Sequence, residues 1–415
     1  MTVGFHAPPA AARMDLDVIR DWAEFEVLKD PWQALERRDP GGSVFLSWEW
    51  LAQAFRAHPG RWLVVVAHRG DRILGLLPLK TRLHWSTSQN RFETEIEAGG
   101  RLIWSEYTGL LCDPEAEQEV IAAMARRVQM LPWARLSLRY VDPPARAEAF
   151  LNAFPRDRFS AKWRDYRING GETDNLICPR VELPDSHDDW LSGLPSKNMR
   201  QKIRRFTRRY LDSGELRIET AGTAGDSARD LDHLLRFWLE KWAGPKGRGT
   251  AERVAANYRE VLGTAQRLGL LHLPVLWQGD SPLGALGHVL DPSTGRVNFI
   301  VAGRDTTADA AQIGVLLHAE SIRWAIDNGY HSYDFCHGDE AYKFTYGAEG
   351  HRVGYLSVRR RGADATAPRF DRFNAAEALS RMQTMIEAGQ GERAVAACRQ
   401  LASVLAGAAP HGSIS

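Results

Sequence analysis

A short stretch near residue 340 gathers side chains that can move protons or carry charge. Tyr333 and Phe335 are typical of the end of a buried strand, which Gly338 is expected to break. The polar residues that accompany them are Asp334, His337, Asp339, Glu340, Tyr342 and Lys343. Acyl transfer to an amine needs a base of near-neutral pKa, a donor for the oxyanion and a cation or acid for the leaving group. All these residue types are present, and α/β folds collect binding sites at strand ends. An ordinary polar loop is the alternative.

A second stretch, residues 196–210, combines one apolar face with dense positive charge. Met199, Ile203, Phe206 and Tyr210 recur at helical spacing, and Ser196 is a suitable N-cap. The other positions include seven basic residues and no acidic one: Lys197, Arg200, Lys202, Arg204, Arg205, Arg208 and Arg209. Such a surface favours binding of CoA phosphates, a nucleotide-linked acceptor or the backbone of a tRNA. A solvated helix face that binds nothing is the alternative.

The elements that must position these stretches recur in the two halves of the chain. The first half predicts a hairpin turning at residues 69–71, a strand at 102–104, a helix at 114–129 and a strand at 134–141. The second half predicts a hairpin turning at 278–280, a strand at 297–301, a helix at 308–328 and a strand from His331. Gly100 then corresponds to Gly295, and Trp133 to Tyr330. This order indicates a tandem duplication, with chance recurrence of a common α/β order as the alternative.

The duplication predicts an α/β protein of two domains with a helical extension. Each domain is expected to hold a mixed, mostly antiparallel sheet flanked by helices. We place the domains at residues 15–180 and 185–362, and a C-terminal helical tail at 363–415. Within the tail, residues 375–388 and 392–405 have the apolar spacing of two helices.

Several of these segments together resemble a known family. Leu239-Glu-Lys-Trp242, Gly314-Val-Leu-Leu317 and Asp334-Phe…Gly338…Tyr342-Lys343 resemble the CelD-like branch of the GNAT acetyltransferases, which is related to the FemABX peptidyltransferases. The basic stretch resembles the element that begins the family's second half. The resemblance spans about Phe45 to Arg359 and is dense from Lys197 onward. It implies two tandem GNAT domains, of which the first is degenerate or binds the acceptor and the second is the acyltransferase.

The resemblance also implies a reaction and its donors. FemABX relatives take the acyl group from an aminoacyl-tRNA and pass it to a peptidoglycan precursor, and an aromatic–lysine pair stabilises the transition state or leaving group. Tyr342 and Lys343 match that pair. Because no counterpart of the FemABX coiled-coil arm is evident, an acyl-CoA donor is favoured over aminoacyl-tRNA, with acetyl-CoA among the candidates. The acceptor is expected to be an amine of a small molecule or of a saccharide or peptide precursor.

GNAT enzymes hold the CoA pyrophosphate with a glycine-rich turn between a strand and a helix. The matching residues are Gly303, Arg304 and Gly314, but their spacing is longer than the family's pattern. Arg204 and Arg205 of the basic stretch are expected to assist. The departure in spacing makes acyl transfer better supported than CoA as its donor.

These assignments give a mechanistic hypothesis. The acceptor amine attacks the donor carbonyl directly, and Lys343 stabilises the oxyanion or leaving group. Asp339, Glu340 or His337 removes the amine proton. Tyr342 positions substrate or donates a proton, and Asp334 orients its neighbours.

The overall composition excludes several other classes of protein. The 415 residues are 44% hydrophobic and 25% charged, as in globular proteins, and the net charge of +1 provides no global attraction for nucleic acid. The four cysteines lie far apart, which predicts neither disulfides nor a metal site. Neither a signal peptide nor a long apolar run is evident, so we expect a cytoplasmic protein that does not insert into membranes. A ligand-binding or scaffold protein without activity is the remaining alternative.

Overall fold

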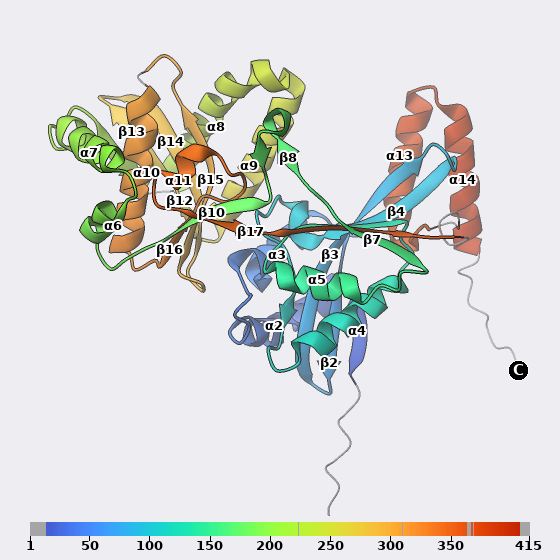
Figure 1. Cartoon of the computed structure of the whole chain (residues 1–415). Coiled ribbons are helices and arrows are strands. Elements are labelled where there is room, and N and C mark those ends of the chain that lie inside the picture. The colour runs from blue at the N-terminus through green and yellow to red at the C-terminus, as the bar shows by residue number, and fades with distance from the viewer. Residues whose placement is uncertain (1–13, 223, 309, 363–366, 368, 407–415) are drawn as a thin grey trace, which may run out of the picture.

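The computed structural model describes residues 14–222, 224–308, 310–362, 367 and 369–406. It contains two large sheets with helices on their faces and a pair of helices at the C-terminal end (Figure 1). The predicted pair of α/β domains with mixed, mostly antiparallel sheets and a helical tail is therefore confirmed.

The first sheet is built mainly from the first half of the chain. Its strands follow the spatial order β1 (Asp15–Ile19), β2 (Trp62–Arg69), β3 (Arg72–Ser86), β4 (Arg91–Ala98), β6 (Arg135–Val141), β18 (Gly354–Arg360) and β7 (Phe159–Trp163), and β5 (Leu111–Cys112) pairs with β3. Only β4 and β6 run parallel; the other neighbours are antiparallel.

The second sheet repeats this order. Its strands are β11 (Arg217–Thr220), β13 (Pro274–Gln278), β14 (Ser281–Asp291), β15 (Arg296–Arg304), β16 (Ser332–Asp334), β10 (Ile177–Glu182) and β17 (Glu349–Arg352), and β12 (Leu271–His272) pairs with β14. Again one pair, β15 and β16, is parallel. The seven strands of the main path match one for one, which is the arrangement expected of a duplicated unit, whereas β5 and β12 pair with opposite ends of β3 and β14.

Each sheet takes its sixth strand from the other half of the chain. β18, near the end of the sequence, lies between β6 and β7, while β10 leaves the first domain and lies between β16 and β17. Figure 1 shows the chain running from β17 across into the first sheet. Leu356 and Val358 are fully buried in the first domain's core. The predicted ranges 15–180 and 185–362 therefore divide the sequence, whereas each sheet also contains a strand from the other range.

Thirteen α-helices cover these sheets in the described part of the chain. They are α1 (Trp22–Val27), α2 (Lys29–Glu36), α3 (Trp48–Ala57), α4 (Glu117–Gln129), α5 (Pro144–Asn152), α6 (His187–Gly193), α7 (Lys197–Phe206), α8 (Ala224–Lys246), α9 (Arg248–Arg267), α10 (Ala310–Asp327), α11 (Ala341–Phe344), α13 (Ala375–Glu387) and α14 (Gly391–Ala406). Shorter elements are η1 (Val44–Leu46), η2 (Gly99–Leu102), η3 (Asn169–Gly171), the π-turn η4 (Thr207–Leu211), η5 (Arg372–Asn374) and the hairpin β8 (Arg167–Ile168) with β9 (Thr173–Asp174).

One predicted strand is wrong, and it changes the alignment of the two halves. Residues 102–104 lie in η2 and the turn after it, whereas the strand β4 precedes them. Gly100 thus follows β4, while Gly295 precedes β15, its counterpart in the second sheet. The sequence of β4, Arg-Phe-Glu-Thr-Glu-Ile-Glu-Ala, alternates apolar with charged residues. Phe92 packs against the tail, whereas Ile96 and Ala98 on the same face lie in the first domain's core.

The two tail helices pack on the long hairpin of β3 and β4. Ala378, Met382, Ala397 and Leu401 form a separate small core with Leu83 and Phe92 of that hairpin. Gln400 extends the strand pairing: its amide donates to the carbonyl of Phe92 and accepts from the Phe92 N–H, both at 2.8 Å. The tail is therefore attached to the first domain, although it follows the second in sequence.

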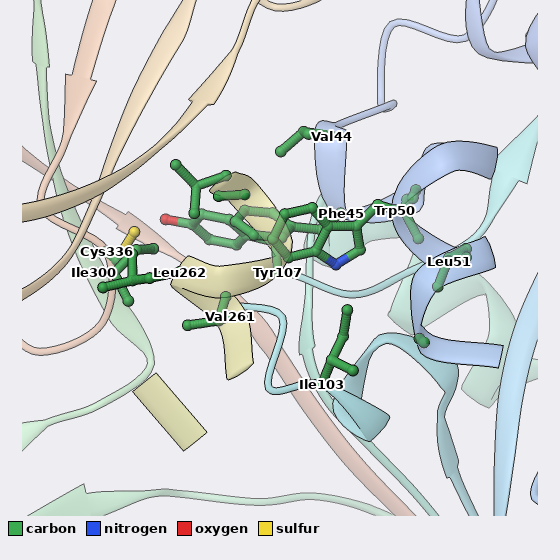
Figure 2. Packing of buried hydrophobic residues seen from close by; sticks show 14 of the residues in the cluster. Val44, Phe45, Trp50, Leu51, Ile103, Tyr107, Val261, Leu262, Ile300 and Cys336 are labelled. Atoms are coloured by element: carbon green, nitrogen blue, oxygen red, sulfur yellow. The ribbon is translucent and has the colours of Figure 1, made fainter. Parts of the chain in front are cut away.

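A continuous apolar core joins the two domains. Figure 2 shows Phe45, Trp50 and Tyr107 of the first domain beside residues of α9, β15 and the segment after β16. The latter are Val261, Leu262, Ile300 and Cys336. Since buried apolar contacts are the main stabilising interaction, the domains are expected to unfold together.

The strand exchange predicts where a C-terminal substitution is felt. Leu356→Ala removes a fully buried side chain from the first domain's core and should lower the free energy of unfolding by about 2–5 kcal/mol. Amide hydrogen exchange should accelerate first in β6 and β7. Ser357→Ala, on the opposite face of β18, is the control and should change both quantities little. Faster exchange confined to β16 and β17 would contradict the assignment.

Candidate functional site

The candidate site lies where the two domains meet, just after β16. The chain leaves this strand at Asp334, turns through Cys336 and Gly338 with positive φ angles, and enters the short helix α11. All six residues predicted to do chemistry lie on this turn and helix. Loop residues 103–110 of the first domain face them, as the following contacts show.

Asp334 is the buried anchor of the turn. Its carboxylate accepts hydrogen bonds from the Tyr107 hydroxyl at 2.8 Å and from the backbone N–H of Cys336 at 2.7 Å, and it pairs with Arg180 at 2.9 Å. Burial alone would raise the pKa of this carboxyl, but Arg180 and Arg296 hold it below its usual range. Asp334 therefore remains charged and ties β16, β10 and the first domain together.

His337 forms a carboxylate–imidazole pair with a residue of the first domain. Its Nδ1 lies 2.6 Å from a carboxylate oxygen of Glu106, and its ring stacks on Tyr140 with centroids 3.6 Å apart. Only 9% of the His337 side chain is exposed. Its Nε2 is buried and has no hydrogen-bond partner within the described residues. When Nδ1–H donates to Glu106, Nε2 carries the free lone pair and can accept a proton.

Lys343 is buried rather than exposed. Its ammonium lies 2.7 Å from the carbonyl oxygen of His337, 2.9 Å from that of Gly338 and 2.9 Å from the carboxylate of Glu340. Two of its N–H groups thus donate to backbone carbonyls, Glu340 is its ion-pair partner, and 4% of the side chain is exposed. In this arrangement Lys343 fixes the backbone at His337 and Gly338.

The remaining predicted residues have different surroundings. Asp339 accepts a hydrogen bond from the backbone N–H of Asp174 at 2.7 Å and so joins the turn to the β7–β10 connection. Tyr342 is 44% exposed, and its ring lies near those of His318 and Phe335. Of these groups, Tyr342 is the one most open to an incoming substrate.

The second sheet opens beside this turn. β15 and β16 pair through only three residue pairs, ending at Asn298 and Asp334, while β15 continues to Arg304. The pairing of β15 with β14 shifts by one residue, which leaves Ile300 as a bulge. Bulges next to a strand opening redirect side chains and are frequent near active sites.

Comparisons with known proteins agree with this architecture. Residues 197–344 match the family model described as "Acetyltransferase (GNAT) domain". The matched residues lie within the second domain. The solved structure titled "Crystal structure of FemX" is similar over 79% of this chain and 95% of its own, with 11% identity and a TM-score of 0.56. A tandem GNAT protein from the clavulanic acid biosynthesis pathway is similar over 84% and 99%, with 12% identity and a TM-score of 0.46. No curated protein matches the sequence.

The resemblance is to the fold, and it covers both halves. The first domain has the GNAT domain's strand order in its own sheet, so the chain consists of two tandem GNAT-like domains and a helical tail. The strands β15 and β16 and the helix α10 all lie within the residues that the family model matches.

The residues expected to hold CoA phosphates do not form one continuous turn. A Cβ at Gly303 would lie 2.3 Å from the carbonyl oxygen of Leu234, so glycine is required there for the packing of α8. Arg304 ends β15, and one of its terminal nitrogens is buried without a partner among the described residues. Gly314 lies inside α10, with open space where a Cβ would be.

The basic stretch is helical as predicted and borders a shallow groove. Ser196 caps α7 by accepting from the N–H of Met199, and Ile203 and Phe206 pack into the second domain's core. The groove is lined by Asn198, Gln201, Lys202, Arg204, Arg205 and Arg208. Since α7 and α10 share this core, the groove lies on the side of the domain that carries α10.

Within the described ranges, no group of three or more histidine, cysteine, aspartate or glutamate residues could hold a metal ion. No helix in the same part of the chain is long and apolar enough to cross a membrane.

Sequence reasoning missed the first domain's contribution. Glu106, Tyr107 and Tyr140 contact the second domain's turn, although they are far from it in sequence. Tyr107 and Asp334, for example, are 227 residues apart. The one local signal is the group Trp-Ser-Glu-Tyr at 104–107, which contains an acid and a tyrosine in a stretch without helix or strand periodicity.

Buried histidines form a hydrogen-bonded chain with Tyr333, the residue before Asp334. His288 lies 2.8 Å from the Tyr333 hydroxyl and 3.1 Å from the carbonyl of His272, and His318 lies 3.1 Å from the same hydroxyl. His318 can thus donate to Tyr333, Tyr333 to His288 and His288 to the carbonyl of His272. This requires neutral rings, and burial lowers the pKa of His288 to about 3. Burial also holds the pKa values of His272 and His318 well below the usual value.

This network predicts an acid-sensitive fold. Because the folded-state pKa of His288 is depressed, the unfolded chain binds more protons, and stability falls as pH drops below about 6.5 towards 3. Each such histidine adds a slope of up to about 1.4 kcal/mol per pH unit. His288→Gln should reduce the slope of unfolding free energy against pH, measured by urea denaturation. His351→Gln, at an exposed position, should leave it unchanged. Equal slopes in the wild type and His288→Gln would contradict the prediction.

Proposed function

We propose that this protein is an N-acyltransferase that moves an acyl group from a CoA thioester to an amine. The observation that carries the proposal is the pair of Glu106 and His337, whose free Nε2 lies buried where a GNAT domain meets a second GNAT-like domain. A buried imidazole held by a carboxylate is suited to accept a proton from an attacking amine. The CelD-like branch remains the family branch that the sequence resembles.

In the proposed step the amine nitrogen attacks the thioester carbonyl, and a carbon–nitrogen bond forms. The Nε2 atom of His337 takes one proton from the amine, while Glu106 stabilises the imidazolium that results. The tetrahedral intermediate then collapses, the carbon–sulfur bond breaks, and His337 returns its proton to the thiolate. Amide and free CoA thiol are the products.

The neighbouring residues take supporting parts. Lys343 holds the carbonyls of His337 and Gly338, which makes it a positioning residue rather than the oxyanion donor of the sequence hypothesis. Asp334 fixes the start of the turn, while Asp339 and Glu340 hold its end. Tyr342, being exposed, positions substrate or passes a proton to the leaving group.

The donor is placed in the opening between β15 and β16. Arg304 lies at the end of this opening, and we assign Gly303 and Gly314 to its rim. Arg204 and Arg205 would bind the outer phosphates from α7. Acetyl-CoA is the simplest donor of this kind. The four cysteines are free thiols in the structure, which fits a cytoplasmic enzyme.

A second donor is favoured by one observation. The groove along α7 is lined by several cationic side chains, more than a single pyrophosphate requires, and a charged tRNA would use them all. An amino-acid transfer from aminoacyl-tRNA would keep the same base and the same acceptor geometry.

The proposed base predicts a specific loss of activity. His337→Ala should lower kcat by about a hundredfold or more, and Glu106→Gln by a smaller factor, because proton removal and ring orientation are lost. Thiol release from acetyl-CoA in the presence of an amine panel measures this. The exposed His351→Ala is the matched control. Normal turnover in His337→Ala would remove His337 from the mechanism.

The donor can be identified by stabilisation of the folded protein. A true donor present at about 100 times its Kd should stabilise the fold by about 2.7 kcal/mol, seen as a rise in Tm. Arg204→Gln/Arg205→Gln should weaken this response, whereas Arg126→Gln/Arg156→Gln, an equal charge change at exposed positions of the first domain, should not. A response to charged tRNA alone, steeply reduced by salt, would establish the second donor. No response to any donor would leave a ligand-binding or scaffold protein.

A further inference from the structure

The first domain has its own strand opening, and two arginines occupy it. β4 and β6 pair in parallel only as far as Glu97 and Ser137. Beyond this point the chain after β4 turns into η2, while β6 continues to Val141. Arg101 of η2 and Arg139 of β6 lie by the same Tyr140 ring, with guanidinium carbons 5.2 and 5.6 Å from its centroid.

Arg139 is surrounded by aromatic rings and has no acceptor among the residues that the structure describes. Its guanidinium lies 4.8 Å from the ring of Tyr166 and 5.3 Å from that of Tyr355, in addition to Tyr140. No hydrogen bond or ion pair of the Arg139 side chain is found in the described part of the chain, and its Nε is buried without a partner. Aromatic rings stabilise a guanidinium through their faces and leave the in-plane N–H groups free to bind an acceptor.

The nearest carboxylates are committed elsewhere. Glu97 pairs with Lys80 at 2.9 Å and lies 3.5 Å from Arg82, and Glu106 pairs with His337. Arg101 uses one terminal nitrogen on the carbonyl of Ser105. Burial, reinforced by the charge of Arg139, lowers the pKa of Arg101 despite nearby acidic groups. Two partly buried cations therefore share a site in which the Nε of Arg139 has no acceptor among the described residues, and an anion would supply one.

We propose that Arg139 and Arg101 bind an anionic group of the acceptor, a carboxylate or a phosphate. The assignment of this anion to the acceptor rests on the proposed function. The anion site itself rests on the geometry of the first domain. Tyr140 connects the anion site to the proposed base, because its ring contacts both arginines and also stacks on His337. An anion held by the arginines thus lies one aromatic ring from the proposed base.

This placement defines the class of acceptor. It is an amine that carries its negative charge a few bonds from the nitrogen, such as an amino acid or an amino-sugar phosphate. Neutral amines of similar size lack the charge-assisted hydrogen bonds and should bind about ten- to a hundredfold more weakly. The first domain then selects the acceptor, and the second domain supplies the base turn and the donor opening.

The test uses the full chain and inorganic anions. Sodium phosphate and sodium acetate are titrated against sodium chloride at matched ionic strength, and Tm is followed. A saturable rise in the millimolar range is expected, and Arg139→Gln should abolish it. Arg139→Lys, which keeps the charge but not the planar fork, should bind at least several-fold more weakly. Arg126→Gln, an equal charge loss at an exposed site, should bind as the wild type does.

The outcomes separate the sources of the anion from a general salt effect. Saturation with phosphate alone identifies a phosphate group, with acetate alone a carboxylate, and either supports the proposal. A rise that never saturates and is equal in Arg139→Gln is stabilisation by salt exclusion and overturns it. So does the absence of any rise. If the anion binds but His337→Ala remains fully active, the proposed mechanism fails while the anion site stands.

Discussion

The reciprocal exchange of strands β10 and β18 is the constraint on which the other features depend. Without β18, β6 and β7 would have no common neighbour, and without β10 the same gap would open between β16 and β17. Because each sheet is completed by the other half of the chain, the domains cannot separate as units. The loop that contains Glu106 and the turn that contains His337 are consequently held against each other by backbone pairing as well as by side-chain contacts.

Buried charge at the junction converts this constraint into a defined geometry. Asp334 would be costly to bury alone, and its partners come from β10, which is exchanged, and from Tyr107 of the first domain. The same turn is closed by Lys343, whose ammonium holds two backbone carbonyls. His337 lies between these two fixed points. A ring placed in this way keeps one nitrogen on Glu106 and leaves the other free, which a side chain on a flexible loop could not do.

Much of this could be predicted from local sequence, and the rest could not for a physical reason. The helix predicted at 308–328 is α10, the apolar spacing within residues 196–210 predicted α7, and the hairpin turns at Gly70 and Gly279 pointed to the duplication. The residues of the base turn were also found, because they are contiguous. Glu106, Tyr140 and Arg139 were not, since their roles arise from contacts across the chain that leave no spacing pattern. The exchange of β18 was equally invisible: a strand's alternation shows which face is buried but not which sheet it joins.

The order in which a ribosome makes the chain gives the strand exchange a further meaning. β18 is the last strand of the sequence, yet it occupies an interior place in the first sheet, and its Arg360 pairs with Phe159. At about 5–20 residues per second, roughly ten to forty seconds pass between synthesis of the two. Until β18 emerges, β6 and β7 present unpaired backbone edges of the kind that other chains can join. The first sheet of the nascent protein therefore stays incomplete until β18 has been synthesised.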